Sequence, residues 1–365
     1  MIDNTPLTGL PESVNVARRI KSDARKIFLD EGLLLTPSEH FRFEKEISNF
    51  KKVAAKDILH NVFADVDVPS EVFDKLLRPV AFGHLEAKTI HSLCGGERDF
   101  SKKLGEIGGV YVAWVCYFDE LCDKSPDIIQ HITKHVDKKL LSKAINGSSS
   151  NKNIFLQNLP KNIDSRLIPL FILWQTYIQE SKKLYESSMR KNVWSEFTTT
   201  ISAQYSQQLD CIEIKIPNFQ PDMWETIRTR SSSPLWVNFL INFLSNDTNL
   251  KFYSPRLRDA ILRLGDVAKI VDDIIDLTDD LSDRRWNYVL IKAFEKHPSI
   301  FDKIDRQDNL EIIQLIIDKG ILNESIRDAC SSYHSAMNEL KKIGLFTRDF
   351  EQYMKLFLSN WFKHQ

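Results

Sequence analysis

The chain has 365 residues, of which 42% are hydrophobic and 27% are charged, and its formal net charge is -1. A near-neutral chain has no overall attraction to nucleic acid or to anionic membranes, so neither is expected as a partner. The chain contains only 12 glycines and 13 prolines, and its apolar residues recur at helical spacing, which predicts an all-α protein.

The five cysteines are odd in number and form no CxxC pair. This usage indicates a reducing, cytoplasmic setting and argues against a zinc site or a disulfide framework. The first 19 residues lack the apolar segment of a secretory signal. No run approaches the roughly 18 apolar residues of a spanning helix, so stable membrane insertion is not expected.

Residues 1–15 are expected to form a flexible arm, and residues 16–365 are expected to form one α-helical domain. Residues 146–163 are polar and are expected to form a connection between helices. Apolar spacing predicts helices over about 16–31, 37–57, 72–93, 166–186, 194–214, 308–318, 322–343 and 347–364.

A first acidic cluster ends an apolar helix between residues 107 and 125. Asp119 and Asp123 are four residues apart and share one helix face, and Glu120 lies beside them. Carboxylates at the C-terminus of a helix have the wrong sign for its dipole, so a cation should compensate them. For Glu120 a salt bridge at the surface is the alternative, and an ordinary acidic helix end is the alternative for the whole cluster.

A second acidic cluster holds five aspartates within residues 272–280. On a helix that begins near residue 255 and continues past 280, Asp272, Asp276 and Asp280 stack at i, i+4 and i+8. Like charges in such a stack destabilise the helix, and oxygen ligands of this kind suit Mg²⁺. Lys269, four residues before Asp273, is expected to neutralise Asp273 when no metal is bound. The alternative is a solvated acidic face.

A third segment carries Arg228 and Arg230 just before three serines and Pro234. Because proline removes a backbone donor and disturbs the preceding turn, the helix is expected to break near Ser231 and Ser232. A broken helix beside arginines favours an anion, whereas the alternative is a simple turn between helices.

Two carboxylate clusters with an arginine-bearing break between them suit the departure of a diphosphate leaving group. Metal held by carboxylates neutralises the diphosphate, and arginine binds phosphate through paired hydrogen bonds. An apolar pocket excludes water and aromatic rings stabilise a carbocation. The candidate pocket walls are Trp114, Phe118, Trp236, Phe239 and Trp286, for which a purely structural core role is the alternative.

Residues 114–123 resemble the aspartate-rich first metal motif of class I terpene synthases, in the all-α isoprenoid synthase superfamily. Residues 117–125 are also similar to the large-terpene synthases of the tetraprenyl-β-curcumene type. Residues 272–280 resemble the family's second metal motif, and Arg228, with Arg230 as the second choice, resembles its diphosphate-sensing arginine.

The resemblance implies a single helical bundle with a central apolar cavity. It also implies a Mg²⁺-dependent cyclase, a lyase that ionises a linear prenyl diphosphate and cyclises the cation to a terpene. About three Mg²⁺ ions are implied, with Mn²⁺ as the alternative ion. The implied metal ligands are Asp119, Glu120, Asp123, Asp272, Asp273, Asp276 and Asp280, and the diphosphate ligands are Arg228, Arg230, Lys269, Arg284 and Arg285. The catalytic residues among them are Asp119, Arg228 and Asp272.

Several residues depart from the terpene synthase pattern. Asp276 stands where that family usually has Ser or Thr, and Asp280 stands where it has Glu. These changes make residues 272–276 similar to the DDxxD motif of trans-prenyl chain synthases. The alternative function is therefore a trans-prenyltransferase that condenses isopentenyl diphosphate with an allylic primer, although no second, basic diphosphate site is identified. A second alternative is a non-catalytic helical interaction protein, and a homodimer is left open.

Overall fold

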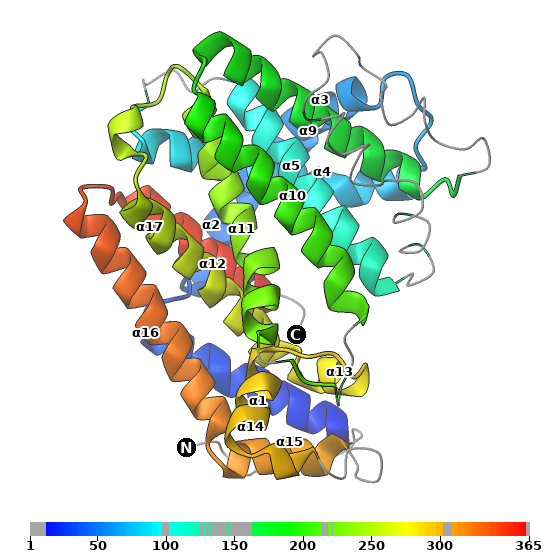
Figure 1. Ribbon diagram of the computed structural model, residues 1–365, viewed down its shortest axis with the longest axis vertical. Coiled ribbons are helices and arrows are strands. Elements are labelled where there is room, and N and C mark those ends of the chain that lie inside the picture. Colours follow the sequence, from blue (N-terminus) through cyan, green and yellow to red (C-terminus); the bar gives the residue numbers. More distant parts are fainter. Residues whose placement is uncertain are drawn as a thin grey trace. The chain divides into compact units, whose positions relative to one another are not determined.

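The computed structural model describes residues 12–96, 102–124, 163–213, 218–220, 222–301 and 309–362, with the single positions 128, 132, 145 and 216. Every regular element in these ranges is a helix (Figure 1), which confirms the predicted all-α fold. Residues 146–162 of the connection expected at 146–163 and residues 1–11 of the expected arm lie outside the described residues, as do the side chains of Asp123 and Arg230.

The chain forms two compact units that are discontinuous in sequence. Unit 1 comprises residues 1–40, 210–233 and 255–365, and unit 2 comprises residues 41–209 and 234–254. Each unit is described by itself below. The single domain expected over residues 16–365 stays a prediction.

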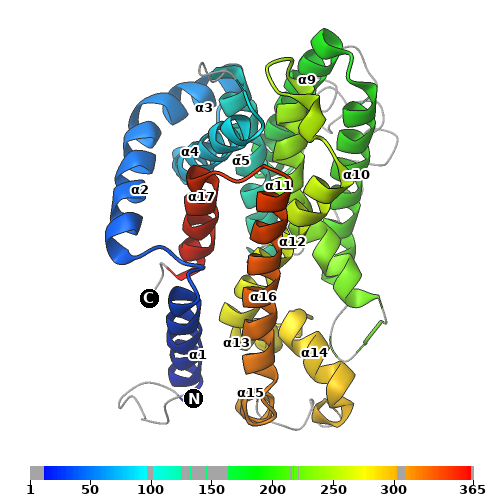
Figure 2. The same ribbon diagram turned by 90° about the vertical axis from the view of Figure 1, so that its left-hand side faces the viewer.

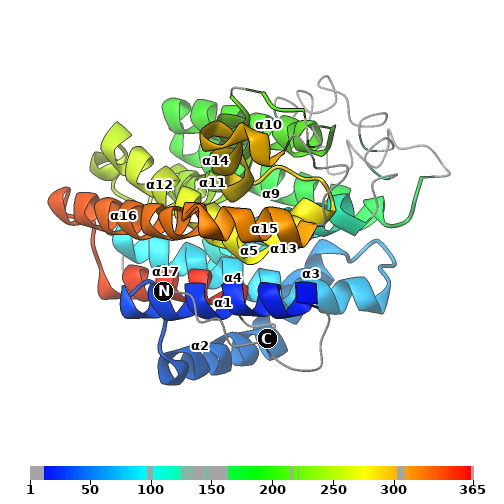
Figure 3. The ribbon, with the colours of Figure 1, turned by 90° about the horizontal axis from the view of Figure 1, so that it is seen from below.

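Unit 1 contains the second acidic cluster. Its helices are α1 (Glu12–Asp30), the first half of α11 (Met223–Leu244), α12 (Pro255–Ile275), α13 (Leu277–Ser282), α14 (Tyr288–Lys296), η3 (Pro298–Ile300), α15 (Asn309–Asp318), α16 (Ile321–Lys342), α17 (Arg348–Ser359) and η4 (Asn360–Phe362). The helix α12 packs along α16, and α1 contacts both. Figure 2 shows α16 extending along α12, and Figure 3 shows α15 next to the start of α16.

The core of unit 1 follows from apolar residues at helical spacing. In α12, Leu257, Ile261, Leu264 and Val271 recur at intervals of three, four and seven, and each is fully buried. Burial of one such side chain stabilises the fold by about 1.5–3 kcal/mol. This apolar stripe fixes which face of α12 packs against its neighbours, and it therefore fixes which carboxylates that face carries inward.

Unit 2 contains the first acidic cluster. Its helices are most of α2 (Pro37–Phe50), the π-helix η1 (Lys51–Ala55), α3 (Lys56–Val62), α4 (Ser70–Leu93), α5 (Lys102–Lys124), α9 (Leu167–Ser188), most of α10 (Lys191–Glu213), the second half of α11 and η2 (Leu250–Phe252). The helices α4 and α5 pack extensively against each other and lie side by side (Figure 1). Gly83 and Gly109 allow this approach, since a Cβ at Gly83 would lie 2.4 Å from the Gly108 carbonyl oxygen and one at Gly109 would lie 2.8 Å from the Val80 carbonyl oxygen.

The structure corrects two expected helix boundaries. The acidic helix does not continue past residue 280, because α12 ends at Ile275 and Asp276 is the N-cap of the short helix α13. The break expected near Ser231 and Ser232 is wrong, because α11 stays helical across Pro234. A hydrogen bond from the Ser232 hydroxyl to Asp266 of α12 holds this part of α11 in place.

Candidate functional site

The turn at Asp276 preserves the spacing of the second acidic cluster. The Asp276 amide donates to the Asp272 carbonyl oxygen at 2.9 Å, and the Asp280 amide donates to the Asp276 carbonyl oxygen at 2.8 Å. Each aspartate is therefore one hydrogen-bonded turn from the next. The structure thus brings Asp272, Asp276 and Asp280 together at the junction of α12 and α13, although no single helix carries them.

Lys269 bridges two adjacent carboxylates of this cluster. Its ammonium nitrogen lies 2.8 Å from Asp272 Oδ2 and 2.6 Å from Asp273 Oδ1. The Lys269 side chain is 14% exposed, Asp272 is 20% exposed and Asp273 is fully buried. The predicted pairing of Lys269 with Asp273 is confirmed by this geometry. Lys269 also pairs with Asp272, a contact that was not predicted from the sequence.

Burial and mutual repulsion act on the protonation of Asp276. Burial, together with the charges of Asp272 and Asp280, raises the pKa of Asp276 to about 7, while the charges of Lys21 and Lys269 oppose this rise. Burial also raises the pKa of Asp280 and of Asp273. Such shifts mark a place where a cation would stabilise the charged forms.

Three residues around the cluster were absent from the predicted site. Lys21 comes from α1, and its charge opposes the rise in the Asp276 pKa. The Asn287 side-chain amide donates to Asp280 Oδ2 at 2.9 Å. The Tyr288 amide donates to Asp273 Oδ2 at 2.7 Å. Asn287 also caps α14 through its side-chain oxygen, and an Asn before an apolar helical run is the sequence signal for such a cap. Lys21 leaves no comparable signal.

The donor chemistry of the cluster fits Mg²⁺. Asp272, Asp276 and Asp280 offer hard carboxylate oxygens and are each partly exposed, as Mg²⁺ with retained water ligands requires. Asp273 is buried and bound on both oxygens by protein groups. Within the described ranges, no three His, Cys, Asp or Glu side chains are gathered closely enough to hold a metal ion as they stand. Metal binding would therefore require these side chains to rearrange.

Arg228 is held by carboxylates in unit 1. Its Nε atom donates to both oxygens of Asp266, at 3.1 and 3.0 Å, and its Nη1 atom donates to Glu225 at 3.0 Å. The Asp266 carboxylate also accepts from Ser232. These contacts connect the first half of α11 to α12. The role of Arg228 as a diphosphate ligand stays a prediction, and it would require an anion to compete with two carboxylates.

Arg284 and Arg285 follow α13 in the turn that leads to α14. Arg284 adopts a left-handed conformation with φ of 58°, and its carbonyl oxygen accepts from the Ile216 amide at 2.9 Å. Arg285 pairs with Asp283, and its charge partly opposes the rise in the pKa of Asp280. The positive charge of Arg285 therefore interacts electrostatically with the acidic cluster.

The first acidic cluster lies in the last turns of α5, in unit 2. Asp119 is exposed. Glu120 accepts from the Lys75 ammonium at 3.0 Å, and Lys75 also pairs with Glu71 at 3.1 Å. Glu120 thus forms the salt bridge that was its alternative role, and this geometry favours a structural contribution. The metal-binding roles of Asp119 and Asp123 stay predictions.

The five predicted pocket walls are all buried in packed aromatic clusters. In unit 2, the Trp114 ring lies 5.7 Å from Trp174 and 5.4 Å from Phe118, and Trp236 stacks 6.3 Å from Tyr253. In unit 1, Trp286 contacts Phe294 and donates to the Asn218 carbonyl oxygen. Phe239 is fully buried. These contacts are those of core residues, and a role in stabilising a cation stays a prediction for each.

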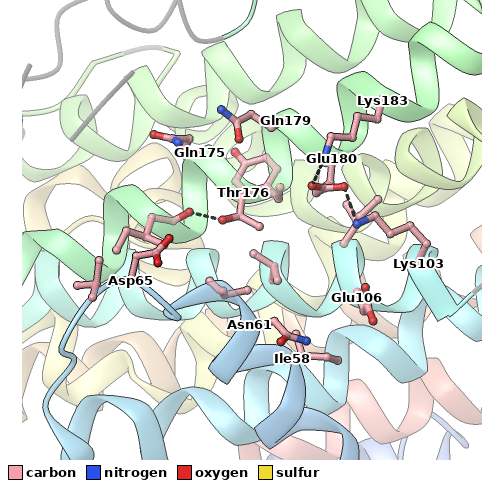
Figure 4. A pocket seen from close by; sticks show the side chains of 16 residues that line it. Ile58, Asn61, Asp65, Lys103, Glu106, Gln175, Thr176, Gln179, Glu180 and Lys183 are labelled. Carbon is pink, nitrogen blue, oxygen red and sulfur yellow. Dashed lines mark hydrogen bonds and ion pairs between the residues drawn. The ribbon is translucent and has the colours of Figure 1, made fainter. Parts of the chain in front are cut away.

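A pocket of about 270 Å³ opens on unit 2 between α3, α5 and α9 (Figure 4). Two lysines line it and both pair with Glu180, Lys103 at 2.5 Å and Lys183 at 2.6 Å. Their charges are therefore partly neutralised, which does not suit a diphosphate site. None of the predicted site residues lines this pocket. It borders the first half of α5, whereas Asp119 and Glu120 lie at the other end of that helix.

The fold is similar to those of two solved prenyl diphosphate synthases. A geranylgeranyl pyrophosphate synthase from Lactobacillus brevis matches with a TM-score of 0.55 and 10% identity, over 89% of this chain and 98% of that chain. A decaprenyl diphosphate synthase from Rhodobacter capsulatus matches with a TM-score of 0.51 and 14% identity, over 89% of this chain and 99% of that chain. No protein-family model and no curated protein sequence matches the chain.

These likenesses establish an isoprenoid-synthase-type helical fold, and they correct the expected activity. The expectation of a terpene cyclase, and so of a lyase, is wrong. The two solved structures reported above are named as diphosphate synthases, which are transferases. The departures at Asp276 and Asp280 had already made residues 272–276 similar to the motif of the chain synthases. None of the helices in the described ranges is long and apolar enough to cross a membrane.

Proposed function

We propose that the chain is a Mg²⁺-dependent trans-prenyltransferase that joins an allylic diphosphate to isopentenyl diphosphate. One observation carries the proposal: Asp272, Asp276 and Asp280 lie one hydrogen-bonded turn apart, and their repulsion helps to raise the pKa of Asp276. Asp272 and Asp276 are also the first and last aspartates of the DDxxD pattern at residues 272–276. The likeness of the fold to two diphosphate synthases supports this assignment.

In the proposed reaction, the group that most needs electrostatic stabilisation is the departing diphosphate. The carbon–oxygen bond of the allylic diphosphate breaks, a carbon–carbon bond forms to isopentenyl diphosphate, and a proton leaves the new chain. Mg²⁺ would neutralise the departing diphosphate as a Lewis acid. Asp272, Asp276 and Asp280 would hold the metal, and Lys269 and Arg285 would donate to phosphate oxygens.

The remaining predicted residues have secondary roles in the proposed function. Asp119 and Asp123 are proposed as further metal ligands, because their spacing places both carboxylates on one face of α5. Arg284 is proposed as a further diphosphate ligand, while Arg228 would first have to exchange Asp266 and Glu225 for phosphate. About three Mg²⁺ ions, a cytoplasmic location and no nucleic-acid partner remain part of the proposal.

The proposal is tested by incubation with Mg²⁺ and allylic diphosphates of increasing chain length, each with and without isopentenyl diphosphate. Mass spectrometry of the products should find chains that retain the diphosphate and are longer by isoprene units, only when both substrates are present. Release of diphosphate with a hydrocarbon or alcohol from the allylic substrate alone would overturn it. The absence of turnover in every mixture would favour the non-catalytic alternative.

Matched variants connect this activity to the cluster. Asp272→Asn and Asp276→Asn should each lower kcat by about 100-fold or more, because each removes a negative group that would hold the metal on the leaving group. Asp279→Asn makes the same chemical change at an exposed position of the same segment. It should leave kcat within about twofold of the unsubstituted protein.

A further inference from the structure

Lys269 and Asp273 form a buried ion pair inside the proposed metal centre. The Lys269 ammonium lies 2.6 Å from Asp273 Oδ1, and the Tyr288 amide donates to Asp273 Oδ2 at 2.7 Å. Asp273 is fully buried, so its charge has no water to stabilise it. Both of its oxygens are engaged by protein groups, and the free energy of burying it depends on the ammonium.

The same ammonium also contacts Asp272, at 2.8 Å from Oδ2. Asp272 is 20% exposed, so it can be reached from solvent as well as by the lysine. A Lys ammonium carries three donors and one positive charge. At this position it supplies part of the charge that a metal ion would supply, and it occupies one carboxylate oxygen that a metal ion would use.

We infer that Lys269 is an internal counter-cation that competes with Mg²⁺ for Asp272, and that Asp273 is its anchor and not a metal ligand. This inference rests on the proposed function of the cluster as a metal centre. Mg²⁺ must displace the ammonium from Asp272, while the buried carboxylate keeps the ammonium within reach. The metal-free protein therefore keeps its carboxylates partly neutralised, and it binds free Mg²⁺ more weakly than three unengaged aspartates would.

The pair can be removed without changing the formal charge of the cluster. Without the exposed Asp279, the unsubstituted cluster contains four carboxylates and one ammonium, and a double variant, Lys269→Met with Asp273→Asn, leaves three carboxylates. Four negative charges plus one positive charge give the same sum as three negative charges. Tighter metal binding by the double variant would therefore report the loss of a competitor, with the formal charge held constant. The double variant also avoids leaving Asp273 as a buried charge without its lysine.

The experiment measures binding of Mn²⁺, as a spectroscopic probe for Mg²⁺, to the full chain in the absence of substrate. The double variant should bind Mn²⁺ about tenfold more tightly than the unsubstituted protein, a change of about 1.4 kcal/mol. Asp273→Asn alone should not tighten binding, because Lys269 then retains Asp272. Asp279→Asn should leave the affinity unchanged. Circular dichroism of each variant confirms that it is folded before binding is compared.

Two results would overturn the inference. Equal affinity in the double variant and the unsubstituted protein would show that Lys269 does not compete, and a loss of binding would make Asp273 a ligand. Asp272→Asn separates these failures from a failure of the proposed centre. If Asp272→Asn weakens Mn²⁺ binding while the double variant does not tighten it, the metal centre stands and only the role of Lys269 falls. If Asp272→Asn has no effect, both fall.

Discussion

Gly265 of α12 lies directly against the backbone of Ser232 in α11. A Cβ at position 265 would lie 2.5 Å from the Ser232 carbonyl oxygen and 2.6 Å from its Cα atom. The Ser232 hydroxyl also donates to Asp266, which holds Arg228. One close contact between two helices of unit 1 therefore sets the position of the Arg228–Asp266 pair.

Gly265→Ala should lower the free energy of unfolding by about 2–4 kcal/mol, because the methyl group meets rigid backbone on the neighbouring helix. Within an unobstructed helix the same change stabilises by about 0.5–1 kcal/mol, so the sign of the effect reports the contact. Denaturant unfolding measures the difference. Asp259→Ala, at an exposed position of the same helix, should stay within about 0.5 kcal/mol. A Gly265→Ala protein as stable as the unsubstituted one would show that the helices can separate freely.

Arg190 of unit 2 holds the C-terminal end of α11. Its Nη1 atom donates to the Phe243 carbonyl oxygen at 2.7 Å and to Thr248 Oγ1 at 3.1 Å, and its Nη2 atom donates to the Thr248 carbonyl oxygen at 3.0 Å. Arg190→Met should lower the free energy of unfolding by about 2–4 kcal/mol, because helix-end carbonyls lose their donors.

A matched substitution separates this role from a general effect of removing an arginine. Arg256 is 61% exposed and pairs with Glu339, so Arg256→Met should change the unfolding free energy by less than about 1 kcal/mol. Arg190→Lys should recover only part of the stability, because a single ammonium cannot reproduce the fork of the guanidinium. Thermal unfolding of the three variants gives the comparison, and equal losses for Arg190→Met and Arg256→Met would contradict the capping role.

The pKa of Asp276 predicts a pH dependence for metal binding. Burial, with repulsion from Asp272 and Asp280, raises the pKa of Asp276 to about 7, so the protonated form predominates below that pH. Metal binding requires the carboxylate and displaces the proton. Mn²⁺ affinity should therefore fall by up to about tenfold for each pH unit below about 7, and it should level off above it.

Titrations between pH 5.5 and pH 8.5 would check the position of this transition. Asp276→Asn should bind more weakly and should lose the part of the slope that comes from this proton. Asp279→Asn should retain the slope of the unsubstituted protein, because its side chain is exposed. A transition near pH 4 would mean that Asp276 does not titrate as a buried, repelled carboxyl group.

His84 of α4 predicts a loss of stability in acid. Its ring stacks on Phe50 with centroids 4.1 Å apart. Burial, with a smaller contribution from Lys88, lowers the pKa of His84 to about 4. Between pH 6.5 and pH 4 the unfolded chain takes up a proton that the folded protein does not, so the stability falls as the pH falls through this window. The loss should total about 1–3 kcal/mol.

His84→Phe keeps an aromatic ring against Phe50 and removes the titration. Unfolding free energies measured in denaturant from pH 8 to pH 4 should fall less steeply for this variant than for the unsubstituted protein, by the slope of one proton. Identical slopes would show that His84 accepts its proton in the folded protein as readily as in the unfolded chain.

Most of the helices, and one ion pair of the acidic cluster, were predictable from the sequence. Apolar spacing predicted α4, α9, α10, α15 and α16 to within a few residues, because a buried stripe is a property of one segment alone. The pairing of Lys269 with Asp273 was readable for the same reason, since residues four apart on a helix are neighbours. The fold class followed from these elements. The enzyme class did not, because one segment is similar to both families: residues 272–280 resemble the second metal motif of terpene synthases, and residues 272–276 resemble the DDxxD motif of chain synthases.

Only the tertiary structure decided which side chains face which partners. Asp272 and Asp273 are adjacent and chemically identical, yet packing buries one completely and leaves the other partly exposed. Lys21 of α1 opposes the rise in the pKa of Asp276 from a segment remote in sequence. Asp266 of α12 likewise accepts hydrogen bonds from Arg228, which lies on another helix. Periodicity gives the face on which a residue lies, but not the element that packs against that face. Burial, protonation and the choice of partner depend on that element, so they were fixed only when the helices came together.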